Sequence, residues 1–149
     1  MRLEATRILV PVNGDPATER TFRWTCRMAR QDKAEIHVIY VMEVPLDLPL
    51  ESDLTNDIAK GERILETIEA IGAEERFRDV EAKLLRARSA GRALVQETED
   101  RRIDLVVLGV PYRKRFGTFQ IGSTASYIFN NASCRVLFLR DQAGMAYLD

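Results

Sequence analysis

Four short runs rich in Ile, Leu and Val constrain the fold of this chain more than any other feature of its sequence. They occupy residues 7–12, 35–42, 103–109 and 135–140, and in each run apolar side chains fall on odd and even positions alike. Such runs indicate strands of a parallel sheet that helices cover on both faces. A fifth run at 80–84 alternates apolar and charged residues, which predicts a wetter strand at an edge of that sheet.

Helical patterns separate the first three of these strands. Asp15 can cap a helix that has Pro16 at its first position and extends to about residue 31. After a loop at residues 43–50, apolar residues recur at spacings of three, four and seven. This periodicity predicts the longest helix of the chain, and Gly72 is expected to close it.

Two more helices complete the alternation of strands and helices. Ser89 can cap a helix that runs to about residue 101, and another helix is expected to begin near Gly122. A strictly alternating chain of this kind predicts an α/β fold with right-handed crossovers. We therefore expect one domain over residues 1–149, a Rossmann-like open sheet of five parallel strands with helices on both faces.

Composition and charge exclude several classes of protein. The 22 Lys and Arg residues nearly balance 23 Asp and Glu residues, so the net charge of −1 supplies no field for binding nucleic acid or an anionic membrane. No stretch approaches the length of apolar sequence that a membrane span requires. Cys26 and Cys134 lie far apart, and the first residues lack the apolar core of a signal peptide. A reducing cytoplasm is the expected location.

Residues that suit a ligand follow the first and fourth strands. In open parallel sheets, ligands bind outside the carboxyl ends of the strands, where the strand order reverses. Asn13 follows the first strand directly. The fourth strand ends at Gly109, and a basic loop over residues 110–121 leads to a helix that opens with Gly-Ser-Thr at 122–124. Free backbone amides and two hydroxyls at that helix start suit a phosphate.

This stretch resembles the nucleotide signature of the universal stress proteins of the UspA type, and the resemblance covers about residues 7–140. The signature reads glycine, two residues, glycine, nine residues, glycine, then serine or threonine. Gly109, Gly122 and Ser123 keep this spacing, whereas Tyr112 stands in place of the second glycine. Asn13 stands where the family usually has aspartate.

The resemblance implies an adenine nucleotide, ATP with Mg²⁺ or Mn²⁺ on its phosphates, at the switch point between strands one and four. Its base would lie near Pro11, Asn13 and Val41, and its ribose and phosphates near the glycines and the start of the last helix. No catalytic residue and no metal ligand from the protein is expected. The candidate binding residues are Pro11, Val12, Asn13, Val41, Gly109, Tyr112, Arg113, Gly122, Ser123 and Thr124.

The two departures from the family pattern decide between two functions. Asn13 keeps a side-chain oxygen that can accept a hydrogen bond from an adenine amino group. Tyr112 replaces a glycine that would let the backbone approach a ligand, so its ring either fills the phosphate channel or swings outward. An open channel predicts a nucleotide-responsive regulatory protein with an unknown protein partner. A closed channel predicts a dimeric scaffold that binds no nucleotide.

Enzymatic activity has little support in the sequence. The reaction to consider is slow ATP hydrolysis or phosphoryl transfer, and no residue stands out for orienting a water or an acceptor near the terminal phosphate. His37, the only histidine, lies in the middle of a strand, where a core or surface role is expected. The acidic residues of the loop and helix start that follow this strand are expected to form a solvated rim; they are Glu43, Asp47, Glu51, Asp53 and Asp57.

The last strand, Arg135–Arg140, predicts a homodimer. In the expected strand order 3-2-1-4-5 it lies at an edge, yet residues 136–139 are all apolar. An apolar edge invites pairing with a second copy across a two-fold axis, and dimers of the family commonly join there. The tail over residues 141–149 shows no pattern and is expected to fray.

Overall fold

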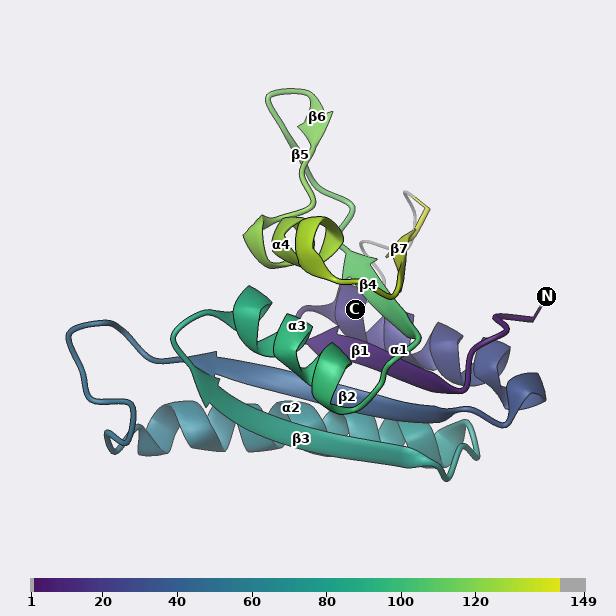
Figure 1. Cartoon of the computed structure of the whole chain (residues 1–149), viewed down its shortest axis with the longest axis horizontal. Helices are drawn as coiled ribbons and strands as arrows, with labels where there is room; N and C mark the ends of the chain where they lie inside the picture. The colour runs from purple at the N-terminus through teal and green to yellow at the C-terminus, as the bar shows by residue number, and fades with distance from the viewer. Residues whose placement is uncertain (1, 143–149) are drawn as a thin grey trace.

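The computed structural model describes residues 2–142, and their centre is a parallel sheet of five strands in the order β3-β2-β1-β4-β7 (Figure 1). This confirms the predicted fold and strand order, since β7 is the fifth strand of the sequence pattern. Two short strands, β5 and β6, precede it and form a separate hairpin. The sheet strands are β1 (Arg7–Val12), β2 (Glu35–Glu43), β3 (Val80–Ala87), β4 (Leu105–Val110) and β7 (Arg135–Arg140).

Helices cover both faces of the sheet, as the doubly buried strands require. Along β1, Ile8 and Val10 pack in one core with residues of α1 and α2, whereas Leu9 packs in a second core with residues of α3 and α4. The helices are α1 (Pro16–Ala29), α2 (Thr55–Glu74), α3 (Ala90–Asp100) and α4 (Ser123–Asn131), with a 3-10 turn η1 (Arg30–Asp32) after α1. Within residues 2–142, no helix combines the length and the apolar character that crossing a membrane demands.

Local capping sets the starts of two helices. Asp15 Oδ1 accepts a hydrogen bond from the Ala17 backbone N–H at 2.9 Å, with Pro16 at the first helical position. The Ser89 hydroxyl accepts from the backbone N–H of Arg92 at 3.4 Å. Both caps were predicted, because Asp and Ser side chains satisfy N–H groups that have no partner inside a helix.

The predicted end of α2 at Gly72 is wrong, because the helix continues to Glu74. Gly72 is buried near the ring of Phe22, where α2 crosses α1. The chain reverses only at Arg76, whose φ of 54° lies in the left-handed region. Packing between the two helices therefore explains this glycine better than a role as a helix stop.

The tail prediction falls largely outside the described residues. Of residues 141–149, the structure describes only Asp141 and Gln142. The Asp141 carboxylate accepts a hydrogen bond from Arg20 of α1 at 2.5 Å. The chain is thus held against α1 directly after β7.

Glu75 joins α1 to the end of α2. Its carboxylate lies 2.6 Å from Arg27 Nε and 3.1 Å from Arg23 Nη1, and its backbone carbonyl accepts from Arg30. The hydrogen bond from Arg27 is the main reason why the pKa of Glu75 is lowered from its ordinary value of 4.5. Partial burial opposes this shift without cancelling it.

We expect Glu75→Gln to lower the free energy of unfolding by about 1 kcal/mol at neutral pH, because it removes the charge that two arginines share. A lowered pKa stabilises the folded state above the unfolded pKa, and this contribution disappears as the pH falls through the folded pKa. Urea unfolding at about pH 7 and about pH 3 should therefore show a smaller difference at the lower pH. Glu62→Gln, at an exposed position of the same helix, is the control.

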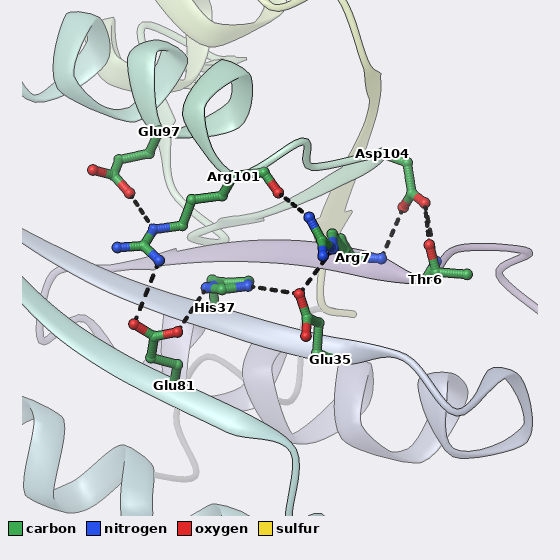
Figure 2. Close-up of polar contacts among 8 residues, drawn as sticks. All are labelled: Thr6, Arg7, Glu35, His37, Glu81, Glu97, Arg101 and Asp104. Atoms are coloured by element: carbon green, nitrogen blue, oxygen red, sulfur yellow. Dashed lines mark hydrogen bonds and ion pairs between the residues drawn. The ribbon is translucent and has the colours of Figure 1, made fainter.

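A polar network joins the starts of the strands to the end of α3 (Figure 2). His37 is buried in it, with Nε2 3.2 Å from Glu35 Oε1 and Nδ1 3.5 Å from Glu81 Oε2. Arg101 binds Glu97 at 2.8 Å and Glu81 at 3.5 Å. Of the core and surface positions expected for His37, the structure therefore shows the buried one.

Asp104 ties the start of β4 to the start of β1 (Figure 2). Its carboxylate accepts hydrogen bonds from the Thr6 backbone N–H at 3.0 Å, the Thr6 hydroxyl at 2.9 Å and the Arg7 backbone N–H at 3.3 Å. The two strands then pair only at Ile8 with Leu105 and at Leu9 with Val106. Beyond that point they part, and Pro11 has no N–H with which to continue a ladder.

Candidate functional site

A cleft of about 1020 Å³ lies where β1 and β4 part, at the carboxyl ends of the strands. Its size is at the upper end of the range typical of small-molecule sites. Nine of the ten predicted binding residues line it. They are Pro11, Val12, Asn13, Val41, Gly109, Arg113, Gly122, Ser123 and Thr124. Tyr112 is the one predicted binding residue that does not line the cleft.

One wall of the cleft is apolar and comes from residues that the sequence analysis did not single out. Ile39 and Leu108 belong to β2 and β4, while Ala90 and Leu94 come from the first turns of α3. The sequence pattern points to residues directly after the strands. These four residues do not follow a strand, because two of them precede the strand ends and two lie on a helix. The crossover that packs α3 against the sheet brings them to the cleft.

Another part of the cleft lining is built to receive an anion. It contains the start of α4, where Gly122 has a φ of 81° and no side chain caps the helix. The first N–H groups of α4 therefore lack a side-chain acceptor and carry the positive end of the helix dipole. Ser123 and Thr124 add hydroxyl groups at the same place. This arrangement suits a phosphate.

The basic loop contains a hairpin that the sequence analysis did not predict. Strands β5 (Lys114–Arg115) and β6 (Thr118–Phe119) pair antiparallel, and the hairpin projects from the body of the molecule beyond α4 (Figure 1). Its turn residues, Phe116 and Gly117, both have positive φ, as tight hairpin turns require. The Phe-Gly pair was a weak turn signal beside the run of three basic residues. Arg113, Lys114 and Arg115 all line the cleft.

Tyr112 points away from the cleft. Its ring contacts the Phe119 ring edge to face, with centroids 4.9 Å apart. The Arg140 guanidinium lies 5.1 Å from the centroid of Tyr112 and 4.0 Å from that of Phe119. Of the two orientations that the sequence left open, the structure has the outward one, because a neighbouring ring and a cation hold the tyrosine there. The ring does not close the cleft.

The side-chain oxygen of Asn13 is already used within its own loop. It accepts a hydrogen bond from the Asp15 backbone N–H at 2.9 Å and lies 3.5 Å from the hydroxyl of Thr18. A carbonyl oxygen has two lone pairs. The predicted contact with an adenine amino group would therefore have to replace or share these bonds.

Gly109 has a packing reason that the sequence analysis did not see. A Cβ atom there would lie 2.5 Å from the hydroxyl of Thr21 and 2.9 Å from the carbonyl of Ala17. The strand therefore approaches α1 more closely than any side chain allows. Gly109 lines the cleft with its backbone and packs against α1 on its other side.

We expect Gly109→Ala to lower the free energy of unfolding by about 1–3 kcal/mol, because the new methyl group overpacks the contact between β4 and α1. Thr21→Ala removes the nearest atom, so the double variant should lose less stability than the sum of the single variants. Urea denaturation of the unmodified protein, the two single variants and the double variant measures these free energies of unfolding. Strict additivity would mean that the methyl group clashes elsewhere.

The remaining candidate residues lie outside the cleft. Burial raises the pKa of the Cys26 thiol to about 12, so it is a protonated core residue, and burial also raises the pKa of Cys134. All five acidic residues of the predicted rim are exposed; they are Glu43, Asp47, Glu51, Asp53 and Asp57. Glu43 also accepts a hydrogen bond from the backbone N–H of Ala90 at 3.0 Å, which supports the start of α3.

Comparison with known proteins agrees with this architecture. The profile of the universal stress protein family matches residues 4–140. A universal stress protein of Methanocaldococcus jannaschii is 26% identical over 140 residues, which cover 90% of this chain and 81% of that protein.

Solved structures share the fold. A universal stress protein family protein from Arabidopsis thaliana, crystallised with AMP bound, has a TM-score of 0.72 at 20% identity, with 97% of both chains covered. The universal stress protein from Archaeoglobus fulgidus in complex with dAMP has a TM-score of 0.69 at 20% identity, covering 89% of this chain and 96% of that one.

Proposed function

Because the chain belongs to the universal stress protein family, we propose that the cleft between β1 and β4 binds an adenine nucleotide, ATP in particular. One observation carries this proposal: the uncapped start of α4 faces a cleft that also holds three basic residues. The AMP and dAMP complexes of the two structural relatives support the same class of ligand. The outward Tyr112 ring leaves the channel open. The replacement of glycine by Tyr112 therefore no longer favours a scaffold with a closed channel.

Two parts of the cleft lining divide the ligand between them. The base packs against Val41 and against Ile39 and Leu94 of the apolar wall, where burial of its faces is favourable. The phosphates reach the first N–H groups of α4 and the hydroxyls of Ser123 and Thr124. Arg113 and its two basic neighbours add charge-assisted contacts.

A divalent cation would accompany ATP on its phosphates. Across residues 2–142, no group of three or more His, Cys, Asp or Glu side chains is arranged to hold a metal ion. Mg²⁺ commonly keeps most of its ligands from substrate phosphates and water. We therefore propose Mg²⁺ or Mn²⁺ as a partner of the nucleotide rather than of the protein.

The regulatory part of the proposal concerns the loop that carries the hairpin. This loop lines the cleft through its basic residues and contacts β7 through Tyr112, Phe119 and Arg140. A change of its position on nucleotide binding would thus reach the surface of the molecule. A protein partner, yet to be identified, would read that change in the cytoplasm, where the two free cysteines stay reduced.

Calorimetric titration of the protein with ATP and Mg²⁺ should show saturable binding, and Gly122→Val should abolish it. A valine at this left-handed position strains the backbone and blocks the start of α4. Gly117→Val is the matched control, since Gly117 also has a positive φ, with nothing within 4 Å, but does not line the cleft.

A flat titration of the folded, unmodified protein up to millimolar ATP would contradict nucleotide binding. It would favour the scaffold that binds no nucleotide. Equal losses in the two glycine variants would also speak against the assignment, because they would report strain in the loop rather than a blocked site.

We also propose that the protein forms a homodimer through β7. This strand lies at the sheet edge and pairs with β4 alone among the described strands. Its residues 136–139 are half-buried, and Phe138 contacts Phe129, which is 60% exposed, at a centroid distance of 5.8 Å. An apolar edge strand that no other described strand pairs on its outer side favours antiparallel pairing with a second copy.

Light scattering should give about twice the 17.0 kDa mass of the chain, and Phe138→Lys should shift the protein toward monomer. A lysine there introduces a charge into the apolar edge. Phe116→Lys, at the exposed tip of the hairpin, is the control and should remain dimeric. A monomeric unmodified protein at micromolar concentration would rule out this interface, and circular dichroism checks that both variants fold.

A further inference from the structure

An ion pair joins two loops that line the cleft. Asp15 Oδ2 lies 3.3 Å from Arg113 Nη2, so the loop after β1 contacts the loop after β4. The Asp15 side chain is 18% exposed, whereas that of Arg113 is 77% exposed. Both residues line the cleft. The pair therefore occupies the place where an anionic ligand would meet the basic loop.

Asp15 is held by contacts that do not involve Arg113. Its other carboxylate oxygen caps α1 through the 2.9 Å hydrogen bond to the Ala17 N–H, and its backbone N–H binds Asn13. A carboxylate at a helix N-terminus is also stabilised by the helix dipole. Arg113 has no comparable anchor among the described contacts, where its backbone N–H donates to the carbonyl of Pro111 at 2.9 Å. Arg113 is thus the partner that can move.

Asp15 is also the one acidic residue among the described residues that line the cleft, which it shares with the basic residues Arg113, Lys114 and Arg115. A carboxylate in this place repels a phosphate and lowers its affinity for the cleft. Its presence therefore calls for an explanation. A helix cap alone does not require the charge, because Asn caps helices as well as Asp does. The charge, in contrast to the cap, is what binds Arg113.

We propose that Asp15 determines how strongly the cleft favours phosphate-bearing ligands, by holding Arg113 until a phosphate chain takes it over. This inference rests on the proposed nucleotide site and adds a specificity-determining residue to it. Arginine forms paired hydrogen bonds with phosphate oxygens, and an exposed pair with a carboxylate is weak enough to be exchanged. A nucleoside without phosphates leaves the pair intact, whereas a triphosphate that reaches Arg113 breaks it.

The exchange has two consequences that separate it from simple charge repulsion. Without ligand, loss of the Asp15 charge should free the loop that carries the hairpin. With ligand, loss of that charge should strengthen binding only where Arg113 is present. General repulsion between Asp15 and a phosphate would instead act whether or not Arg113 is there.

The first arm of the test uses the protein without ligand. Asp15→Asn keeps the helix cap and removes the charge, so trypsin should cleave after Lys114 and Arg115 several-fold faster than in the unmodified protein. Asp47→Asn, an exposed acidic residue outside the cleft, should leave the rate unchanged. Mass spectrometry assigns the cleavage sites. An unchanged rate in Asp15→Asn would overturn the role of the pair in holding the loop.

The second arm is a double-mutant cycle measured by calorimetry with ATP. Asp15→Asn should raise the affinity by about two- to fivefold, the range expected from releasing an exposed ion pair. When Arg113→Gln is already present, Asp15→Asn should leave the affinity for ATP unchanged. Adenosine should bind the unmodified protein, the two single variants and the double variant with equal affinity. Lys114→Gln is the matched control: it should lower ATP affinity yet preserve the gain from Asp15→Asn.

A gain that persists without Arg113 would overturn the exchange and leave plain repulsion as the explanation. Absence of ATP binding to the unmodified protein would contradict the proposed function instead. Inorganic tripolyphosphate, titrated against the same four proteins, then tests the exchange without a base. Failure of tripolyphosphate to bind, or binding with no dependence on Asp15, would overturn the inference itself.

Discussion

The short pairing between β1 and β4 is the constraint on which the rest of the site depends. Two registered residue pairs join these strands, after which they part. Asp104 secures their starts through Thr6 and Arg7, so the separation occurs only at the carboxyl ends. Pro11 cannot donate the next ladder hydrogen bond. The cleft exists because β1 and β4 are bound to each other at one end and separate from each other at the other end.

Close packing around this opening keeps its walls in place. Gly109 lets β4 approach α1, and Glu75 binds α1 to the end of α2 on the same face of the sheet. On the other face, α3 adds the apolar wall of the cleft and α4 adds its anion-receptive start. Sites built on packed helices and strands are more precise than sites built on loops alone. The basic loop is the element of the site that packing holds least, and it carries most of the charge.

That loop connects the cleft to the edge of the sheet. Arg140, the last residue of β7, lies over the rings of Tyr112, which precedes the hairpin, and of Phe119, which belongs to its strand β6. Cation–π contacts of this kind are modest in energy, so they guide the loop without locking it. Through these contacts Tyr112, which departs from the family signature, joins the basic loop to β7. This is the strand through which we propose that a second copy binds. Tyr112 therefore links two surfaces in the outward orientation, one of the two that the sequence left open.

The sequence by itself determined the order of strands and helices, the two side-chain caps and the signature spacing, because each depends on residues close together along the chain. Together with the family resemblance, it also located nine of the residues that line the cleft, most of them near strand ends, which converge at one edge of a parallel sheet. Tertiary structure alone decided the direction of the Tyr112 ring, the packing role of Gly109 and the pairing of Asp15 with Arg113. Each of these depends on a partner from a distant segment: Arg140, Thr21 or the opposite loop. Periodicity and motif spacing carry no information about such partners, because only the folded chain brings them within contact distance.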